Sequence, residues 1–177
     1  MLAQTLEHNG KTINIKHDDC PESPRTWDNL GTMICFHRRY DLGDKHNIDH
    51  NDYNSFEEME KAIEKKYDAV VLPLYLYDHS GITISTSPFS CNWDSVQVGF
   101  IAISKEKARE EYGWKAITKK RKELLTNYLE GEVETYDQYL RGDIFGYEIL
   151  NSDGEIEDSC WGFYGEESAI EEAKACA

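Results

Sequence analysis

The sequence contains no long hydrophobic run and no closely spaced cysteine pair, and each absence excludes a class of protein. The longest apolar stretch, AVVLPLYLY at 69–77, is too short to span a lipid bilayer. The first residues, MLAQTLEHNGKT, lack a basic segment followed by an apolar one, so we expect no signal peptide. The five cysteines are scattered without C-x-x-C spacing, which argues against a disulfide framework or a zinc ribbon. We therefore expect a cytoplasmic protein with reduced thiols and no membrane contact.

Basic residues are scarce, since 19 Lys and Arg stand against 34 Asp and Glu, a formal net charge of −15 over 177 residues. The imbalance is uneven along the chain. Residues 105–122 carry 3 acids and 8 bases, whereas residues 123–177 carry 15 acids and 2 bases. Such a charge repels nucleic acid overall and attracts basic surfaces, with steering that weakens as salt rises. Solubility alone also explains a high net charge.

Hydrophobic residues make up 40% of the chain, enough for a packed core, and the length suits a single domain over residues 1–177. Apolar patterning predicts strands at 11–17, 30–40, on both sides of a turn at 78–81, and at 96–104, the last apolar on both faces and so central. Pro73 is expected to place its strand at an edge or a bulge. Asp153-Gly154 marks the turn of a hairpin within 144–165.

Helical periodicity appears at 56–66 behind the capping box Ser55-x-x-Glu58, at 105–112, from 117 to a break at Gly131, after a second capping box at Thr135, and at 166–175. Strands and helices mix without a regular βαβ alternation. The predicted fold class is therefore α+β, with a mainly antiparallel sheet and several helices packed on it.

The segment HRRYDLGDKHNIDHND at 37–52 concentrates carboxylate and imidazole groups, the donors that bind Mg²⁺, Mn²⁺ or Zn²⁺. The candidate metal ligands are Asp41, Asp44, His46, Asp49 and His50. Their spacing matches neither H-E-x-x-H nor an EF-hand loop. Asp, Asn and His are also typical of solvated loops, because these side chains bond their own backbone. A divalent metal site and a polar loop both remain open.

A cysteine nucleophile is a further alternative, because Cys35 and His37 share a face of a predicted strand. A catalytic pair also needs an orienting group and an oxyanion site, and a free cysteine is usually a small buried hydrophobe. The sequence favours this second interpretation.

The basic segment KAITKKRK at 115–122 contrasts with the acidic remainder of the chain. Lys119, Lys120 and Lys122 fall outside the apolar stripe of the predicted helix, so they can contact the phosphates of a nucleic acid directly. A solvated helix face is the alternative.

Acidic residues in the last third of the chain recur in rows that can imitate the charge of duplex DNA. The predicted partner-binding acids are Glu130, Glu132, Glu134, Asp137, Asp153, Glu155, Glu157 and Asp158. A protein that presents them can occupy the basic groove of a nuclease or polymerase and compete with nucleic acid.

Four segments, SPRTWDNLGTM, HRRYDLGDKH, GEVETYDQYLRGDIFGYEI and DSCWGFYG, resemble small acidic proteins of bacteriophages and mobile elements in Gram-positive gut bacteria. The resemblance implies a setting in which such proteins block host defence, as anti-CRISPR proteins do against Cas nucleases. It carries over no catalytic motif. The basic segment at 115–122 departs from a pure DNA mimic, and it points instead to a surface that clamps a protein–nucleic-acid complex.

The resulting prediction is a phage or mobile-element protein that acts by binding rather than by turnover, without a cofactor. Its expected partner is a basic nucleic-acid-binding protein, such as a Cas nuclease or its guide-RNA complex, in the host bacterial cytoplasm. The alternatives are a metal-dependent hydrolase of nucleic acid or nucleotides that uses the 41–52 cluster, and a structural phage protein that forms a homodimer through its apolar strands.

Overall fold

The computed structural model describes residues 1–91 and 93–177 and divides the chain into two compact units. The terminal unit comprises Met1–Pro24 and Gln138–Ala177, and the central unit comprises Arg25–Asp137. The sequence predicts one domain over residues 1–177. No linker marks the two units in the sequence, because the second boundary falls inside helix α3 (Lys119–Arg141).

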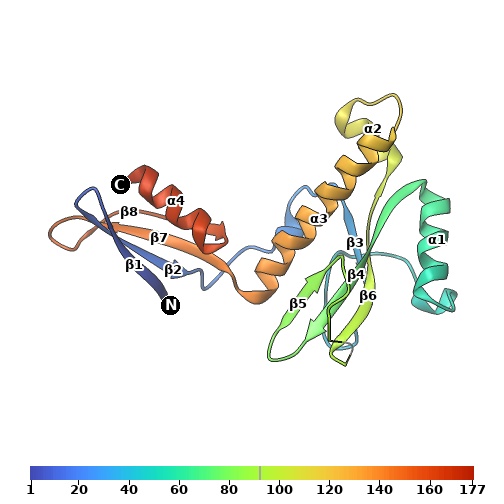
Figure 1. Ribbon diagram of the computed structural model, residues 1–177, viewed down its shortest axis with the longest axis horizontal. Helices are drawn as coiled ribbons and strands as arrows, with labels where there is room; N and C mark the ends of the chain where they lie inside the picture. The colour runs from blue at the N-terminus through green and yellow to red at the C-terminus, as the bar shows by residue number, and fades with distance from the viewer. Residues whose placement is uncertain (92) are drawn as a thin grey trace. The chain divides into compact units, whose positions relative to one another are not determined.

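The terminal unit is a four-stranded antiparallel sheet with one helix on one face (Figure 1). The strand order is β1-β2-β7-β8, and α4 contacts β2, β7 and β8. Apolar residues alternate with polar ones along β2, so Ile13 and Ile15 are buried while Thr12, Asn14 and Lys16 remain partly exposed. The elements are β1 (Leu2–His8), β2 (Lys11–His17), β7 (Ile144–Leu150), β8 (Ile156–Tyr164) and α4 (Glu166–Cys176).

Strand β1 was not predicted from the sequence. It is an edge strand whose residues are mostly exposed. Leu6 packs against the core and is only partly buried, so β1 lacks the succession of buried apolar residues that creates an alternating pattern. The signal that could have identified it is Asn9-Gly10, where both residues have positive φ (49° and 80°) in the turn between β1 and β2. The predicted hairpin at Asp153-Gly154 is confirmed as β7 and β8.

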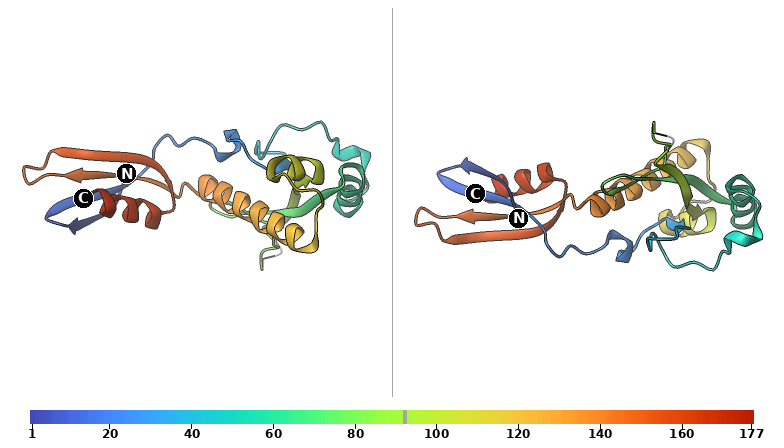
Figure 2. Two further views of the ribbon diagram at one scale, coloured as in Figure 1. Left: turned by 90° about the horizontal axis from the view of Figure 1, so that it is seen from above. Right: turned by 90° about the horizontal axis from the view of Figure 1, so that it is seen from below.

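The central unit contains a second antiparallel sheet, of strand order β3-β6-β4-β5. Helix α1 lies on one side of this sheet and α3 on the other (Figures 1 and 2). The strand predicted to be central, β6, lies between β3 and β4, as its two apolar faces require. The elements are β3 (Thr32–Cys35), α1 (Phe56–Tyr67), β4 (Ala69–Asp78), β5 (Ile82–Ser85), β6 (Ser95–Ser104), α2 (Lys105–Tyr112), and the 3₁₀ turns η1 (Pro24–Thr26) and η2 (His50–Asp52).

Both faces of β6 are buried. Phe100 and Ala102 pack in one cluster with Met59 and Ile63 of α1. Pro73 lies in the part of β4 that pairs with β6 alone, directly before a register shift at Leu74/Tyr75, which confirms the predicted effect of the proline.

The predicted break at Gly131 is wrong, because α3 runs without interruption from Lys119 to Arg141. A buried stripe of Leu125, Leu129, Val133 and Tyr136 continues past the glycine. Burial of these side chains outweighs the cost of a helical glycine, about 1 kcal/mol. Thr135 does not cap a helix; its hydroxyl donates to the carbonyl of Gly131, 2.9 Å away.

The predicted α+β class with antiparallel pairing is confirmed, although the strands form two sheets rather than one. Within residues 1–91 and 93–177, no helix combines the length and the apolar character needed to cross a membrane.

Candidate functional site

Asp44, one of the predicted metal ligands, binds the guanidinium of Arg25. Nε of Arg25 donates to Oδ1 at 2.9 Å and Nη2 donates to Oδ2 at 2.5 Å. The backbone N–H of Met33 donates to the same Oδ2 at 2.7 Å. Asp44 therefore fixes the start of β3 against η1.

Glu132, one of the predicted partner-binding acids, completes this cluster. Its Oε1 accepts from the backbone N–H groups of Leu30 and Gly31, both at 2.9 Å, and Oε2 accepts from Nη1 of Arg25 at 2.9 Å. The side chains of Arg25 and Glu132 are only 6% and 7% exposed. Burial works to lower the pKa of Arg25, but its bonds to the two carboxylates outweigh burial and raise that pKa. Glu132 is a buried structural anchor rather than a contact surface.

His46 lies beside the same strand. Its Nε2 donates to the carbonyl of Cys35 at 3.2 Å, and its ring meets Phe36 edge-on with centroids 4.9 Å apart. Nδ1 is buried, and no group in the described part of the chain bonds to it.

The other predicted ligands do not join Asp44. Asp49 caps η2 by accepting from the backbone N–H of Asn51 at 2.9 Å, and the His50 ring packs edge-on against Phe36. Asp41 is exposed. Among the described residues, no three His, Cys, Asp or Glu side chains come together in a way that could bind a metal ion.

Among the contacts of the described residues, none joins the thiol of Cys35 to the imidazole of His37 as a nucleophile–base pair. Burial, reinforced by the negative charge of Asp44, raises the pKa of the Cys35 thiol to about 12. Nδ1 of His37 accepts from the backbone N–H groups of Arg39 and Tyr40 and so shapes a turn.

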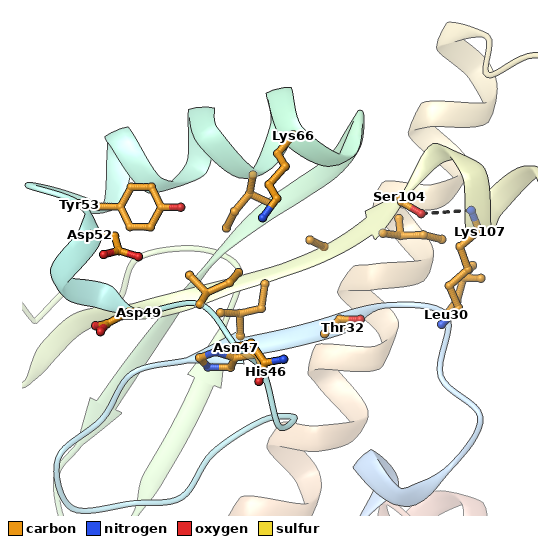
Figure 3. A pocket seen from close by; sticks show the side chains of 15 residues that line it. Leu30, Thr32, His46, Asn47, Asp49, Asp52, Tyr53, Lys66, Ser104 and Lys107 are labelled. Carbon is orange, nitrogen blue, oxygen red and sulfur yellow. Dashed lines mark hydrogen bonds between the residues drawn. The ribbon is translucent and has the colours of Figure 1, made fainter.

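A cavity of about 490 Å³ opens in the central unit between the 46–53 segment, α1 and β6 (Figure 3). Its apolar lining includes Ile34, Ile48 and Ile63. Figure 3 shows Tyr53 and Lys66 directed toward it. The other polar lining residues are Thr32, His46, Asn47, Asp49, Asp52, Ser104 and Lys107. This combination of size and lining suits a small molecule with an apolar body and charged groups.

Of the remaining predicted partner-binding acids on α3, Asp137 is structural, whereas Glu130 and Glu134 are exposed. Oδ1 of Asp137 accepts from the backbone N–H of Ile84 at 2.8 Å and from the hydroxyl of Thr83, which fixes β5 to the helix. Glu130 and Glu134 lie on the exposed side of α3.

The four predicted acids of the β7–β8 hairpin are all exposed: Asp153, Glu155, Glu157 and Asp158. Glu157 pairs with Lys11 at 3.1 Å. Helix α4 adds Glu167, Glu171 and Glu172, also exposed.

The two units differ in net charge. The terminal unit carries 14 acidic and 4 basic residues, a net charge of −10, whereas the central unit carries 20 and 15, a net charge of −5. Three of the four bases in the terminal unit are engaged in ion pairs: Lys11 with Glu157, Lys16 with Glu148 and Arg141 with Asp143. Most of the protein's net negative charge therefore belongs to the smaller unit.

The basic residues Lys119, Lys120 and Lys122 are exposed at the start of α3, as predicted. Sequence reasoning missed the aromatic residues beside them, Tyr112 and Trp114. Their position on either side of Gly113, directly before the basic segment, is the signal that could have identified them.

Comparison of the chain with protein-family models, curated proteins and solved structures found no match.

Proposed function

We propose that this chain is an acidic binding protein of a phage or mobile element, and that it inhibits a host nucleic-acid-handling defence enzyme in the bacterial cytoplasm. The specific target proposed is a Cas nuclease. The terminal unit is the inhibitory module, and it occupies a basic groove that otherwise holds nucleic acid.

The observation that carries this proposal is the concentration of charge in the terminal unit. A net charge of −10 on 64 residues resides mainly in exposed side chains of the β7–β8 hairpin and α4. Nucleic-acid-binding grooves are lined with Lys and Arg. A compact acidic unit is therefore attracted to such a groove when the two approach within about one Debye length, where salt screens the attraction only in part.

We restrict the proposed contact residues to acids whose side chains are exposed. Glu132 and Asp137 are excluded, because both are bonded to the backbone of the central unit. The hairpin acids remain in the set.

Binding of the purified protein to purified Cas nucleases at low salt tests the proposal. The informative variant combines Asp153→Asn, Glu155→Gln and Asp158→Asn, which leaves the Lys11–Glu157 ion pair intact. A matched control combines Asp41→Asn, Asp52→Asn and Glu64→Gln, three exposed acids of the central unit.

Both variants lose three negative charges, so a difference between them reports on position rather than on net charge. We expect the hairpin variant to bind at least tenfold more weakly and with a shallower salt dependence, and the control to bind nearly as the wild type. Absence of binding at low salt, or equal weakening in both variants, would refute the proposal.

A further inference from the structure

Two aromatic rings and a guanidinium stack where α2 meets α3. The rings of Tyr112 and Trp114 lie with centroids 4.4 Å apart and planes inclined by 15°. Cζ of Arg121 lies 4.8 Å from the centroid of the Trp114 ring. Nη1 of Arg121 donates to the carbonyl of Ala116 at 2.7 Å, which fixes the guanidinium in place. The three groups form a preformed stack, and Tyr112 within it is 37% exposed to solvent.

The helix beside this stack begins with four consecutive cations. The first turn of α3 contains no acid, so the positive end of the helix dipole and the charges of 119–122 add rather than cancel. Within the described part of the chain, no ion pair involves Lys119, Lys120 or Lys122. This arrangement is unfavourable for an isolated helix and favourable for one that meets an anion.

We propose that this α2–α3 corner binds single-stranded nucleic acid. The lysines at 119, 120 and 122 contact phosphates, and an unpaired base stacks on the ring of Tyr112. Aromatic platforms beside a basic surface are the usual means of binding single strands without sequence preference. A duplex hides its base faces, and Arg121 is already committed to Trp114 and Ala116, so neither stacking nor groove readout serves a duplex here.

The net charge of −15 does not prevent this contact. At physiological ionic strength the Debye length is about 8 Å, so distant acids are screened and the local charge decides. Residues 105–122 carry a net charge of +5, with Glu106, Glu110 and Glu111 already counted, and this becomes +4 when Asp68, the ion-pair partner of Lys105, is included. The inference concerns the central unit and is independent of the inhibitory function proposed for the terminal unit.

Fluorescence anisotropy with a labelled oligo(dT) of about 15 nucleotides tests the proposal at 0.1 M salt. The first variant combines Lys119→Gln, Lys120→Gln and Lys122→Gln. Its matched control combines Arg38→Gln, Lys61→Gln and Lys65→Gln, exposed cations elsewhere in the same unit. We expect at least tenfold weaker binding for the first variant and a change below twofold for the control. The slope of log K against log salt should fall by about 2, since each phosphate contact contributes about 0.7.

Tyr112→Leu tests stacking without a change of charge, with circular dichroism melting as the check on folding. We expect at least fivefold weaker binding to oligo(dT) and unchanged binding to heparin, a polyanion without bases. No binding of the wild type to oligo(dT) at 0.1 M salt would overturn the proposal. So would heparin or a duplex of equal length binding as tightly as oligo(dT), or Tyr112→Leu having no effect, because the corner would then attract polyanions without recognising bases.

Discussion

The guanidinium of Arg25 and the carboxylate of Asp44 face each other through two hydrogen bonds, Nε to Oδ1 at 2.9 Å and Nη2 to Oδ2 at 2.5 Å. Glu132 occupies the remaining side of the guanidinium. We expect Arg25→Met to lower the free energy of unfolding by about 3–5 kcal/mol, because it leaves two carboxylates without their cation in a largely buried site. Urea denaturation measures this loss.

Arg38→Met is the control for the arginine substitution, because Arg38 is exposed. It should change the free energy of unfolding by less than about 0.5 kcal/mol. Equal midpoints for Arg25→Met and the wild type would show that the cluster does not stabilise the fold.

Two glycines should respond to alanine in opposite directions. A Cβ on Gly99 would lie 1.9 Å from the carbonyl oxygen of Ile34, a backbone atom of the neighbouring strand that cannot yield. A Cβ on Gly131, on the exposed side of α3, would have no atom of residues 1–91 or 93–177 within 4 Å. Thermal unfolding should show severe destabilisation or loss of folding for Gly99→Ala, and a gain of about 0.5–1 kcal/mol for Gly131→Ala. A stabilised Gly99→Ala would contradict the β3–β6 pairing.

The cysteines should differ in reactivity. Cys20, Cys160 and Cys176 are exposed, whereas burial raises the pKa of Cys35 to about 12. Iodoacetamide at pH 8 should alkylate the exposed thiols and leave Cys35 unmodified until denaturant is added. Peptide mapping by mass spectrometry measures the extent at each site, and rapid modification of native Cys35 would contradict its burial.

The same thiol should make the fold sensitive to alkali. The thiol of an unfolded cysteine has a pKa near 8.5, whereas burial raises the pKa of folded Cys35 to about 12. Between these two values the thiol ionises in the unfolded state only, which stabilises the unfolded state relative to the folded state. Stability from this group is complete below about pH 8.5 and falls as pH rises toward 12. Urea midpoints measured from pH 8 to 10.5 should decline more steeply for the wild type than for Cys35→Ala, and parallel declines would refute this assignment.

Asp137 and Glu134 lie one turn apart on α3. Comparison of their alanine variants should distinguish the loss of a structural hydrogen bond from the loss of a surface charge. Asp137→Ala leaves the backbone N–H of Ile84 and the hydroxyl of Thr83 without their acceptor, which we expect to cost about 1–3 kcal/mol. Glu134→Ala removes an equal charge from an exposed position and should cost almost nothing. Urea denaturation of the two variants side by side measures the difference, and equal stabilities would argue against the fixation of β5 by Asp137.

Local patterns predicted most elements of the fold. The alternation of β2, the apolar run of β6 and the Asp153-Gly154 turn each depend on neighbouring residues, and each is present in the structure. Gly131 was misread because a propensity of about 1 kcal/mol was weighed without the buried stripe that crosses it. The two-unit organisation was not predictable from the sequence, because pairing of β2 with β7 joins distant parts of the chain.

The candidate sites show the same limit. Composition identified the exposed acids of the hairpin, but it could not distinguish them from Glu132, whose partners Leu30 and Gly31 lie about 100 residues earlier. Asp44 likewise appeared available as a metal ligand, because nothing in the 37–52 segment indicates that Arg25 binds it. Long-range pairing decides which acids are available for binding.

Assembly of the terminal unit from both ends of the chain has a consequence during synthesis. A ribosome completes the β1–β2 hairpin about 130 residues before β7 emerges, which is roughly 6–25 s at ordinary elongation rates. Throughout that interval the inner edge of β2 is exposed, while the contiguous central unit can already fold. A nascent chain that stalls before β7 therefore presents an unpaired strand edge to neighbouring chains.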